Sequence, residues 1–147
     1  MKNMKEPKFF IATKGLIVQD RKVLIIREAC SYSEGTNAGR YDLPGGRLNP
    51  GENFMASLER EILEETGLTI WIGDPIAVDE WRPVVKGEPW QIVGIFFECR
   101  TKSNKIVLST DHSEYEWIDP KEHKKYPLIE NLHKVFEAYL KRAERDN

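Results

Sequence analysis

The sequence predicts a single α/β domain, in which a mixed sheet carries a helix on each face. Three observations lead to this prediction. Segments with the composition of strands outnumber helical ones, an acidic helix falls between them, and a second helical pattern follows the last strand. No linker, repeat or low-complexity tract divides the 147 residues. We therefore expect one domain over 1–147, with flexible ends at about 1–8 and 143–147.

Composition excludes several classes of function. The net charge is −2 and there is no block of Lys or Arg, so we expect no nucleic acid polymer as a partner. No run reaches the roughly 20 apolar residues of a membrane span, so we expect no membrane partner. Cys30 and Cys99 are far apart, which is typical of reduced thiols in the cytoplasm. The apolar run 9–18 is interrupted by Lys14, so we read no signal peptide.

The N-terminal part predicts a hairpin followed by a loop. Phe9 to Gln19 is rich in aromatic and branched residues, and Val23 to Arg27 is a continuous apolar run of strand length. The segment 28–40 lacks periodicity and reads as a surface loop. Tyr41 to Leu43 reads as a short strand that leads into Pro44-Gly45-Gly46.

More strands are expected after the acidic helix, and a second helix ends the chain. The predicted strand segments are 68–78, interrupted at Gly73-Asp74-Pro75, then 90–100, 106–109 and 114–118. A polar helical turn begins at Asp119-Pro120. Within 128–142, apolar residues recur at offsets of 3, 4, 7 and 8, which is typical of one face of a helix.

The central helix, about Asn53 to Thr66, combines an apolar stripe with an acidic patch. At about 100° per residue, Glu61 and Glu65 lie about 40° apart, and Glu64 lies about 60° from Glu61 on the other side. Three carboxylates on one face repel one another. A hard divalent cation that prefers oxygen ligands would remove that repulsion, so we expect Mg²⁺, with Mn²⁺ as a substitute.

A solvated acidic face, with Arg60 paired to Glu64, is the alternative interpretation of this helix. Two features favour the metal site. Lysines do not alternate with the acids, as they often do on solvated faces. The helix is also entered through glycine-rich turns at 44–46 and 50–52, where backbone groups can face a ligand.

The residues from 46 to 68 resemble the Nudix box at every defined position. The matching residues are Gly46, Glu52, Arg60-Glu61-Ile62, Glu64-Glu65 and Gly67-Leu68. One departure is Tyr41, where many relatives carry Trp three residues before the proline.

The resemblance implies an α/β/α sandwich that hydrolyses a nucleoside diphosphate linked to another moiety. It implies that Glu61, Glu64 and Glu65 bind the metal, and that a carbonyl of Gly45 or Gly46 completes the metal shell. By the same resemblance, Glu52 orients Arg60 and the helix.

The expected chemistry is the in-line attack of an activated water on phosphorus. A carboxylate base adds about 10²–10⁴-fold to such a rate. The candidates are Glu61 and an acid from a late loop, which relatives often supply shortly before a Trp. Glu114 is our first choice for that acid and Glu116 the second, with His112 in an assisting role.

The substrate is read from residues outside the box. Aromatic side chains would stack on a base, and guanidinium groups would clamp a phosphate. The candidates are Tyr32, Trp81 and Trp90 for the base and Arg40 and Arg82 for the phosphate. The leading hypothesis is a nucleoside or deoxynucleoside triphosphate, as in MutT-like members.

Three further possibilities stay open. Pro83 resembles the proline marker of ADP-ribose-hydrolysing relatives, so an ADP-ribose or nucleotide-sugar pyrophosphatase is one alternative. A non-catalytic module that only binds a nucleotide is another. Relatives often form homodimers, although the sequence contains no coiled-coil seam.

Overall fold

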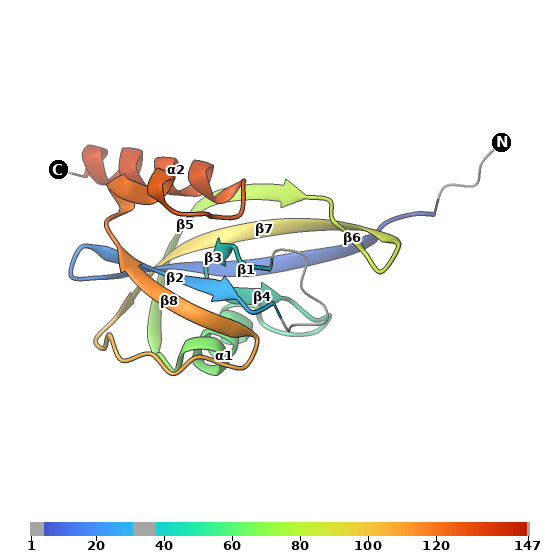
Figure 1. Cartoon of the computed structure of the whole chain (residues 1–147), viewed down its shortest axis with the longest axis horizontal. Coiled ribbons are helices and arrows are strands. Elements are labelled where there is room, and N and C mark those ends of the chain that lie inside the picture. The colour runs from blue at the N-terminus through green and yellow to red at the C-terminus, as the bar shows by residue number, and fades with distance from the viewer. Residues whose placement is uncertain (1–4, 31–37, 147) are drawn as a thin grey trace.

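A single sheet lies between two helices, with α2 on one face and α1 on the other (Figure 1). The computed structural model describes residues 5–30 and 38–146. The strands are β1 Lys8–Gln19, β2 Lys22–Glu28, β3 Tyr41–Asp42, β4 Gly45–Arg47, β5 Ile70–Trp81, β6 Val84–Val85, β7 Glu88–Thr101 and β8 His112–Ile118. The helices are α1 Phe54–Thr66, the 3₁₀ helix η1 Pro120–Lys125 and α2 Leu132–Arg145. This arrangement confirms the predicted α/β/α class.

The sheet is mixed, as predicted. Its main path is β3-β2-β1-β7-β5, while β4 pairs with β1, β6 with β7 and β8 with β2. Strands β1 and β7 run parallel, from Lys8 opposite Trp90 to Val18 opposite Arg100. The other pairs are antiparallel. Strand β5 carries register irregularities around Pro75, so the interruption expected at Gly73-Asp74-Pro75 lies within one continuous strand.

The central strands are buried on both faces. Leu16 of β1 packs towards α2 in a cluster with Phe136, and its neighbour Ile17 packs towards α1 in a cluster with Ile62. Successive side chains of a strand point to opposite faces. A strand covered by a helix on each side therefore has no polar positions, which explains the continuous apolar run of β2.

Helix α1 has a clear start and stop. The side chain of Asn53 accepts hydrogen bonds from two N–H groups of the first turn, at 3.0 and 3.1 Å. Gly67 ends the helix with a left-handed φ of 76°. Leu58 and Ile62 are fully buried against the sheet, whereas Met55, which lies three residues before Leu58 on the same side of the helix, is exposed. The buried stripe fixes which way the glutamates of α1 face.

Three segments differ from the predictions. Residues 106–109 form no strand, because the N–H groups of Val107 and Ser109 donate to carbonyls in the last turn of α1, at 2.9 and 3.1 Å. Residues 45–47 form strand β4 against β1 instead of a loop. Residues 143–145 are helical, so α2 continues beyond the point where fraying was expected.

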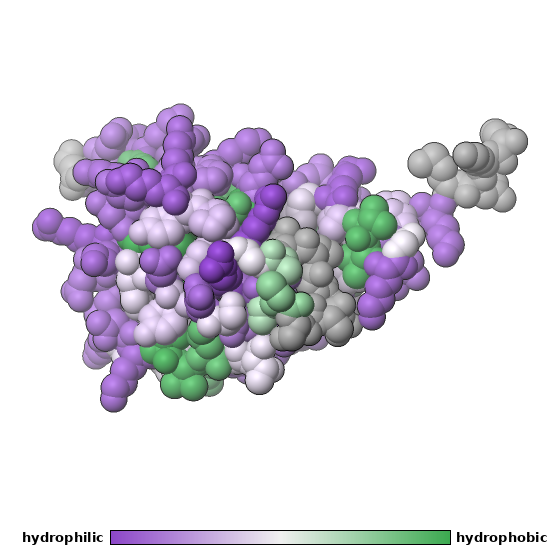
Figure 2. Space-filling view, in the orientation of Figure 1, coloured by the Kyte–Doolittle hydropathy of each residue, from purple (hydrophilic) through white to green (hydrophobic). Residues whose placement is uncertain are grey.

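The surface is largely hydrophilic in the view of Figure 2, with separate hydrophobic patches over α1 and β6. Exposed apolar side chains near these places include Leu63 and Val84. No helix within residues 5–30 and 38–146 has the length and apolar content needed to cross a membrane.

Candidate active site

Glu61, Glu64 and Glu65 of α1 line a cleft of about 450 Å³, which we call the acidic cleft. Its lining residues are Lys14, Glu28, Asp42, Gly45, Gly46, Arg47, Asn49, Glu61, Glu64, Glu65, Ser109, Asp111 and His112. Six of them are Asp or Glu, and two are Lys or Arg. Helix α1, strand β4 and the segment before β8 thus bring together residues that are far apart in the sequence.

Glu65 is the most deeply placed carboxylate of the cleft. Its side chain is 13% exposed, and its Oε1 accepts a hydrogen bond of 3.0 Å from the N–H of Gly45. Burial raises the pKa of Glu65 to about 8, against the opposing effects of Lys14 and of the Gly45 N–H. The His112 Nε2 lies 3.5 Å from Oε2 of Glu65, and burial lowers the pKa of His112. The two side chains therefore meet without a full ion pair at neutral pH.

Glu61 lies directly against the backbone of β4. A Cβ atom added to Gly46 would come within 2.8 Å of the Glu61 carboxyl group. Burial raises the pKa of Glu61, while Arg60 opposes that shift. Gly46 is therefore a glycine because the carboxyl group of Glu61 occupies the space of a side chain.

Arg60 joins the glutamates of the box at the rim of the cleft. Its guanidinium contacts Glu52 at 3.0 Å, Glu61 at 3.4 Å and Glu64 at 3.3 Å. Glu52 also accepts a 2.8 Å hydrogen bond from the N–H of Asn49, and this bond lowers the pKa of Glu52. Arg60 contacts Glu64, as the solvated-face interpretation expects, while Glu61, Glu64 and Glu65 all line the cleft.

The three glutamates that line the cleft differ in their exposure. Glu64 is 59% exposed and turned to Arg60. Within the described residues, no three His, Cys, Asp or Glu side chains are grouped as a metal site. The donors nevertheless fit a hard divalent cation, because burial disfavours the ionised form of Glu61 and Glu65 and a cation would restore it.

Glu114 does not line the cleft, which corrects the expectation for the late-loop acid. Its carboxylate accepts hydrogen bonds from Arg27 at 3.1 Å and from the hydroxyl of Tyr41 at 3.2 Å. In the pairing of β8 with β2, Glu114 lies opposite Arg27 and Glu116 lies opposite Ile25. Ile25 belongs to the hydrophobic cluster on the α2 side of the sheet. Both acids therefore face away from α1, because alternate residues of a strand share a face.

Asp111 and His112 line the cleft instead. The hydrogen bonds of 106–109 to the end of α1 hold this segment beside Glu65. Sequence reasoning named His112 only as an assisting residue and did not single out Asp111. The sequence does not show that residues 106–109 hydrogen-bond to the end of α1 and therefore stay out of the sheet.

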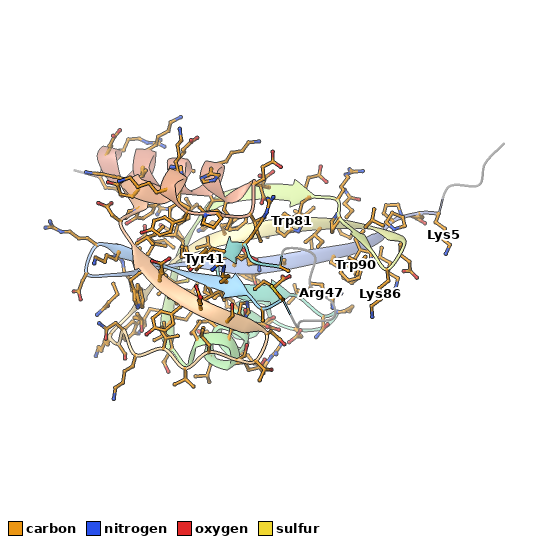
Figure 3. The ribbon with its side chains drawn as sticks, viewed as in Figure 1. Lys5, Tyr41, Arg47, Trp81, Lys86 and Trp90 are labelled. Carbon is orange, nitrogen blue, oxygen red and sulfur yellow. The ribbon has the colours of Figure 1, made fainter. Side chains whose placement is uncertain are left out.

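A second cavity of about 150 Å³ adjoins the acidic cleft, and we call it the tryptophan pocket. Trp81, Trp90 and Arg47 line it, and all three are labelled in Figure 3. The two tryptophans are the side chains expected to stack on a base. The Arg47 guanidinium lies 4.9 Å from the Trp90 ring and 4.6 Å from the Phe10 ring. Arg47 lines both cavities and therefore stands at their junction.

A third cavity of about 570 Å³, the outer pocket, shares Trp81 with the tryptophan pocket. Arg40, Arg82 and Pro83 line it. Arg82 contacts Glu80 at 3.4 Å. Neither arginine lines the acidic cleft, so Arg40 and Arg82 belong to a different cavity from the glutamates. Tyr32 lies outside the described residues.

The lining residues that had no part in the predicted site include Lys14, Asp42 and Asn131. Lys14 and Asp42 form an ion pair of 3.0 Å between β1 and β3. The signal in the sequence was a lysine inside an otherwise apolar strand. Asn131 precedes α2 without capping it, and its buried Nδ2 has no hydrogen-bond partner among the described residues.

Comparisons with known proteins agree with this geometry. The chain matches the family described as NUDIX domain over residues 9–139. It is 27% identical over 121 residues to the nucleoside triphosphatase NudI of Escherichia fergusonii, covering 77% of this chain and 84% of that protein. It is 29% identical over 117 residues to a MutT-like protein of Streptomyces ambofaciens, covering 79% of this chain and 68% of that protein.

A solved structure shares the fold. The MutT protein from Methanosarcina mazei Go1 superimposes with a TM-score of 0.83 at 26% identity, covering 95% of this chain and 99% of that one. Family members hydrolyse phosphoanhydride bonds with the help of divalent metals. The chain therefore belongs to the NUDIX family and is a metal-dependent hydrolase of nucleoside diphosphate-linked substrates.

Proposed function

We propose that this protein hydrolyses nucleoside or deoxynucleoside triphosphates. The observation that carries the proposal is the junction of the acidic cleft and the tryptophan pocket, which share Lys14, Asp42, Gly46 and Arg47. A nucleotide needs such a pair of sites, one for its phosphates and one for its base. The nucleoside triphosphatase NudI of Escherichia fergusonii is a relative that supports this choice.

We assign the metal-binding role to the cleft. Glu61, Glu64 and Glu65 would hold Mg²⁺ or Mn²⁺, together with a carbonyl oxygen of Gly45 or Gly46. A divalent cation bound there would lower the pKa of a water and offset the charge of the pyrophosphate. In the reaction the water oxygen bonds to phosphorus, the phosphoanhydride bond breaks, and the leaving phosphate keeps the electron pair.

The chain's own side chains would handle the proton and hold the glutamates in place. Glu61 is half-buried beside Gly46, and Asp111 lines the same cleft. Either carboxylate can take the proton of the attacking water. Arg60 bridges Glu52 and Glu61, and this bridge fits the orienting role proposed for Arg60 and Glu52.

Asp111→Asn is expected to lower kcat by about 10²-fold or more, because it removes a carboxylate that faces the substrate. Glu114→Gln is the matched control. It makes the same type of change three residues away, on the other face of the sheet, and should leave kcat within a few-fold of wild type. Initial rates at saturating Mg²⁺ check both variants. A large effect of Glu114→Gln together with a small effect of Asp111→Asn would restore Glu114 as the late-loop acid.

The tryptophan pocket is the proposed site of the base. Trp81 packs against Phe96 with ring centroids 6.4 Å apart, and it leaves room beside Trp90. A flat ring between two tryptophans gains stacking energy, and the unpartnered amide of Asn131 is available to hydrogen-bond the base edge.

Trp81→Leu is therefore expected to raise KM by roughly 5-fold to 100-fold, with a smaller change in kcat, since stacking is worth about 1–3 kcal/mol per base. Trp71→Leu is the control, because Trp71 is 54% exposed on β5 and lines none of the three cavities. Steady-state kinetics on the best substrate check the pair. Equal KM values for wild type and Trp81→Leu would place the base elsewhere.

The proposal is tested by a phosphate-release screen with Mg²⁺ across NTPs, dNTPs, ADP-ribose, diadenosine polyphosphates and nucleotide sugars. We expect the highest kcat/KM on a triphosphate. Preference for ADP-ribose or a nucleotide sugar is the second candidate, favoured by the size of the outer pocket and by Pro83 in its lining. Silence across the whole panel, with nucleotide binding retained, would support the non-catalytic module.

A further inference from the structure

Lys14 is a buried lysine at the junction of two cavities. It lies on β1, its side chain is 13% exposed, and it lines both the acidic cleft and the tryptophan pocket. Asp42 holds it at 3.0 Å, and the other oxygen of Asp42 accepts a 2.7 Å hydrogen bond from the N–H of Leu43. The ammonium group therefore has a fixed position between the proposed sites for phosphates and base.

The ammonium group keeps hydrogen-bonding capacity for a ligand. A lysine has three N–H donors. Among the described residues, the Lys14 ammonium group donates a hydrogen bond to Asp42 alone. Six of the residues that line the same cleft are Asp or Glu, so Lys14 is a basic donor within an acidic cavity.

The stability of the folded protein does not by itself explain why a lysine occupies position 14. A buried ion pair gains little over apolar residues of the same size, because both charges lose their hydration. Thr13 and Gly15 flank Lys14 on a strand whose other central residues are apolar. A positive charge at this position is favourable when an anionic ligand binds beside it. Arg47, held on the rings of Phe10 and Trp90, provides a second cation at the same junction.

We infer that Lys14 binds the phosphate group attached directly to the nucleoside, and so makes the enzyme select nucleoside 5′-phosphates. The inference rests on the proposed function, because it takes the base to lie in the tryptophan pocket and the remaining phosphates to lie over the glutamates. A phosphate bound between the two sites would place negative charge beside the Lys14 ammonium group, as the Asp42 carboxylate already does. Lys14 is then a substrate-binding residue that aligns the phosphate chain.

The test compares the binding of a nucleoside 5′-monophosphate with that of its nucleoside, in EDTA, by calorimetric titration of the full chain. EDTA excludes any contribution of a metal to the phosphate affinity. Wild type should bind the monophosphate about tenfold or more tightly than the nucleoside, as charge-assisted hydrogen bonds allow. Lys14→Met should bring that ratio close to one, and Lys14→Arg should keep part of it.

A second variant guards against misfolding. Lys14→Met leaves Asp42 buried without its partner, so the double variant Lys14→Met/Asp42→Asn removes the pair as a unit. It should also lose the ratio, whereas Asp42→Asn alone, which keeps the ammonium, should retain it. A preserved ratio in Lys14→Met or in the double variant would overturn the inference.

The experiments can reject the role of Lys14 without rejecting the proposed function, and they can reject the proposed function without rejecting the role of Lys14. Wild type that hydrolyses triphosphates, yet binds monophosphate and nucleoside equally, keeps the function and loses the role of Lys14. Wild type that shows the Lys14-dependent ratio, yet hydrolyses nothing in the screen, keeps the phosphate site and loses the proposed reaction.

Discussion

Glu65→Gln is expected to lower kcat/KM by roughly 10²-fold or more while the protein remains folded. Glutamine keeps the oxygen that accepts the Gly45 N–H at 3.0 Å, so the contact between α1 and β4 survives. It loses the charge that would bind a cation. Initial rates over a wide range of Mg²⁺ concentration check the prediction. An unchanged rate at saturating Mg²⁺ would contradict a ligand role for Glu65.

The same substitution should stabilise the protein without metal, in a way that depends on pH. Burial raises the pKa of Glu65 to about 8 from its ordinary value of 4.5. Between these values the folded state binds more protons than the unfolded state, so the free energy of unfolding falls as pH rises. Glutamine does not titrate. In EDTA, Glu65→Gln should match wild type near pH 4.5 and exceed its Tm increasingly towards pH 8.

Calorimetric scans in EDTA at several pH values measure this difference. Glu59→Gln is a suitable control, because Glu59 is an exposed acid of the same helix and lines no part of the cleft. Its Tm should follow that of wild type across the range. A constant offset between wild type and Glu65→Gln would contradict the burial cost of the carboxylate.

Gly46→Ala is expected to lower activity by about 10²-fold with little loss of stability. The added Cβ would come within 2.8 Å of the Glu61 carboxyl group, which is the flexible end of a side chain and can move aside. The fold therefore survives, while Glu61 loses its position in the cleft. A displacement of about 1 Å at a reacting centre can cost two orders of magnitude in rate.

Gly45→Ala provides the contrast. Gly45 has a φ of 138°, and a Cβ there would overlap the carbonyl oxygen of Thr13. The obstacle is backbone of the neighbouring strand, so this variant should lose both stability and activity. Thermal unfolding and kcat measured on the two variants separate the effects. Equal stability of the two alanine variants would contradict this account of β4.

The sequence predicts the parts of the site that follow from local spacing. Glu61 and Glu65 share a helix face by periodicity alone, and the cap and stop of α1 are local signals at Asn53 and Gly67. The box therefore identifies one wall of the cleft. The tryptophans that line the neighbouring pocket can also be predicted from residue type, because aromatic rings can stack on a nucleotide base.

The opposite wall depends on contacts between distant segments. Lys14 of β1 meets Asp42 of β3 because β2 pairs with both of these strands. Asp111 reaches the cleft because 106–109 hydrogen-bonds to the end of α1 instead of extending the sheet. Glu114 was the wrong choice for the cleft because the sequence shows that Glu114 and Glu116 share a face, but not which face.

The number of protons released when Mn²⁺ binds at pH 7 tests the central claim, that the buried Glu65 is a metal ligand. Titrations in buffers of different ionisation enthalpy give this number. A carboxyl with a pKa of about 8 is mostly protonated at pH 7 and must ionise to bind metal, so wild type should release close to one proton per site. Glu65→Gln should release almost none. Equal release by the two proteins, or tight binding without release by wild type, would contradict the assignment.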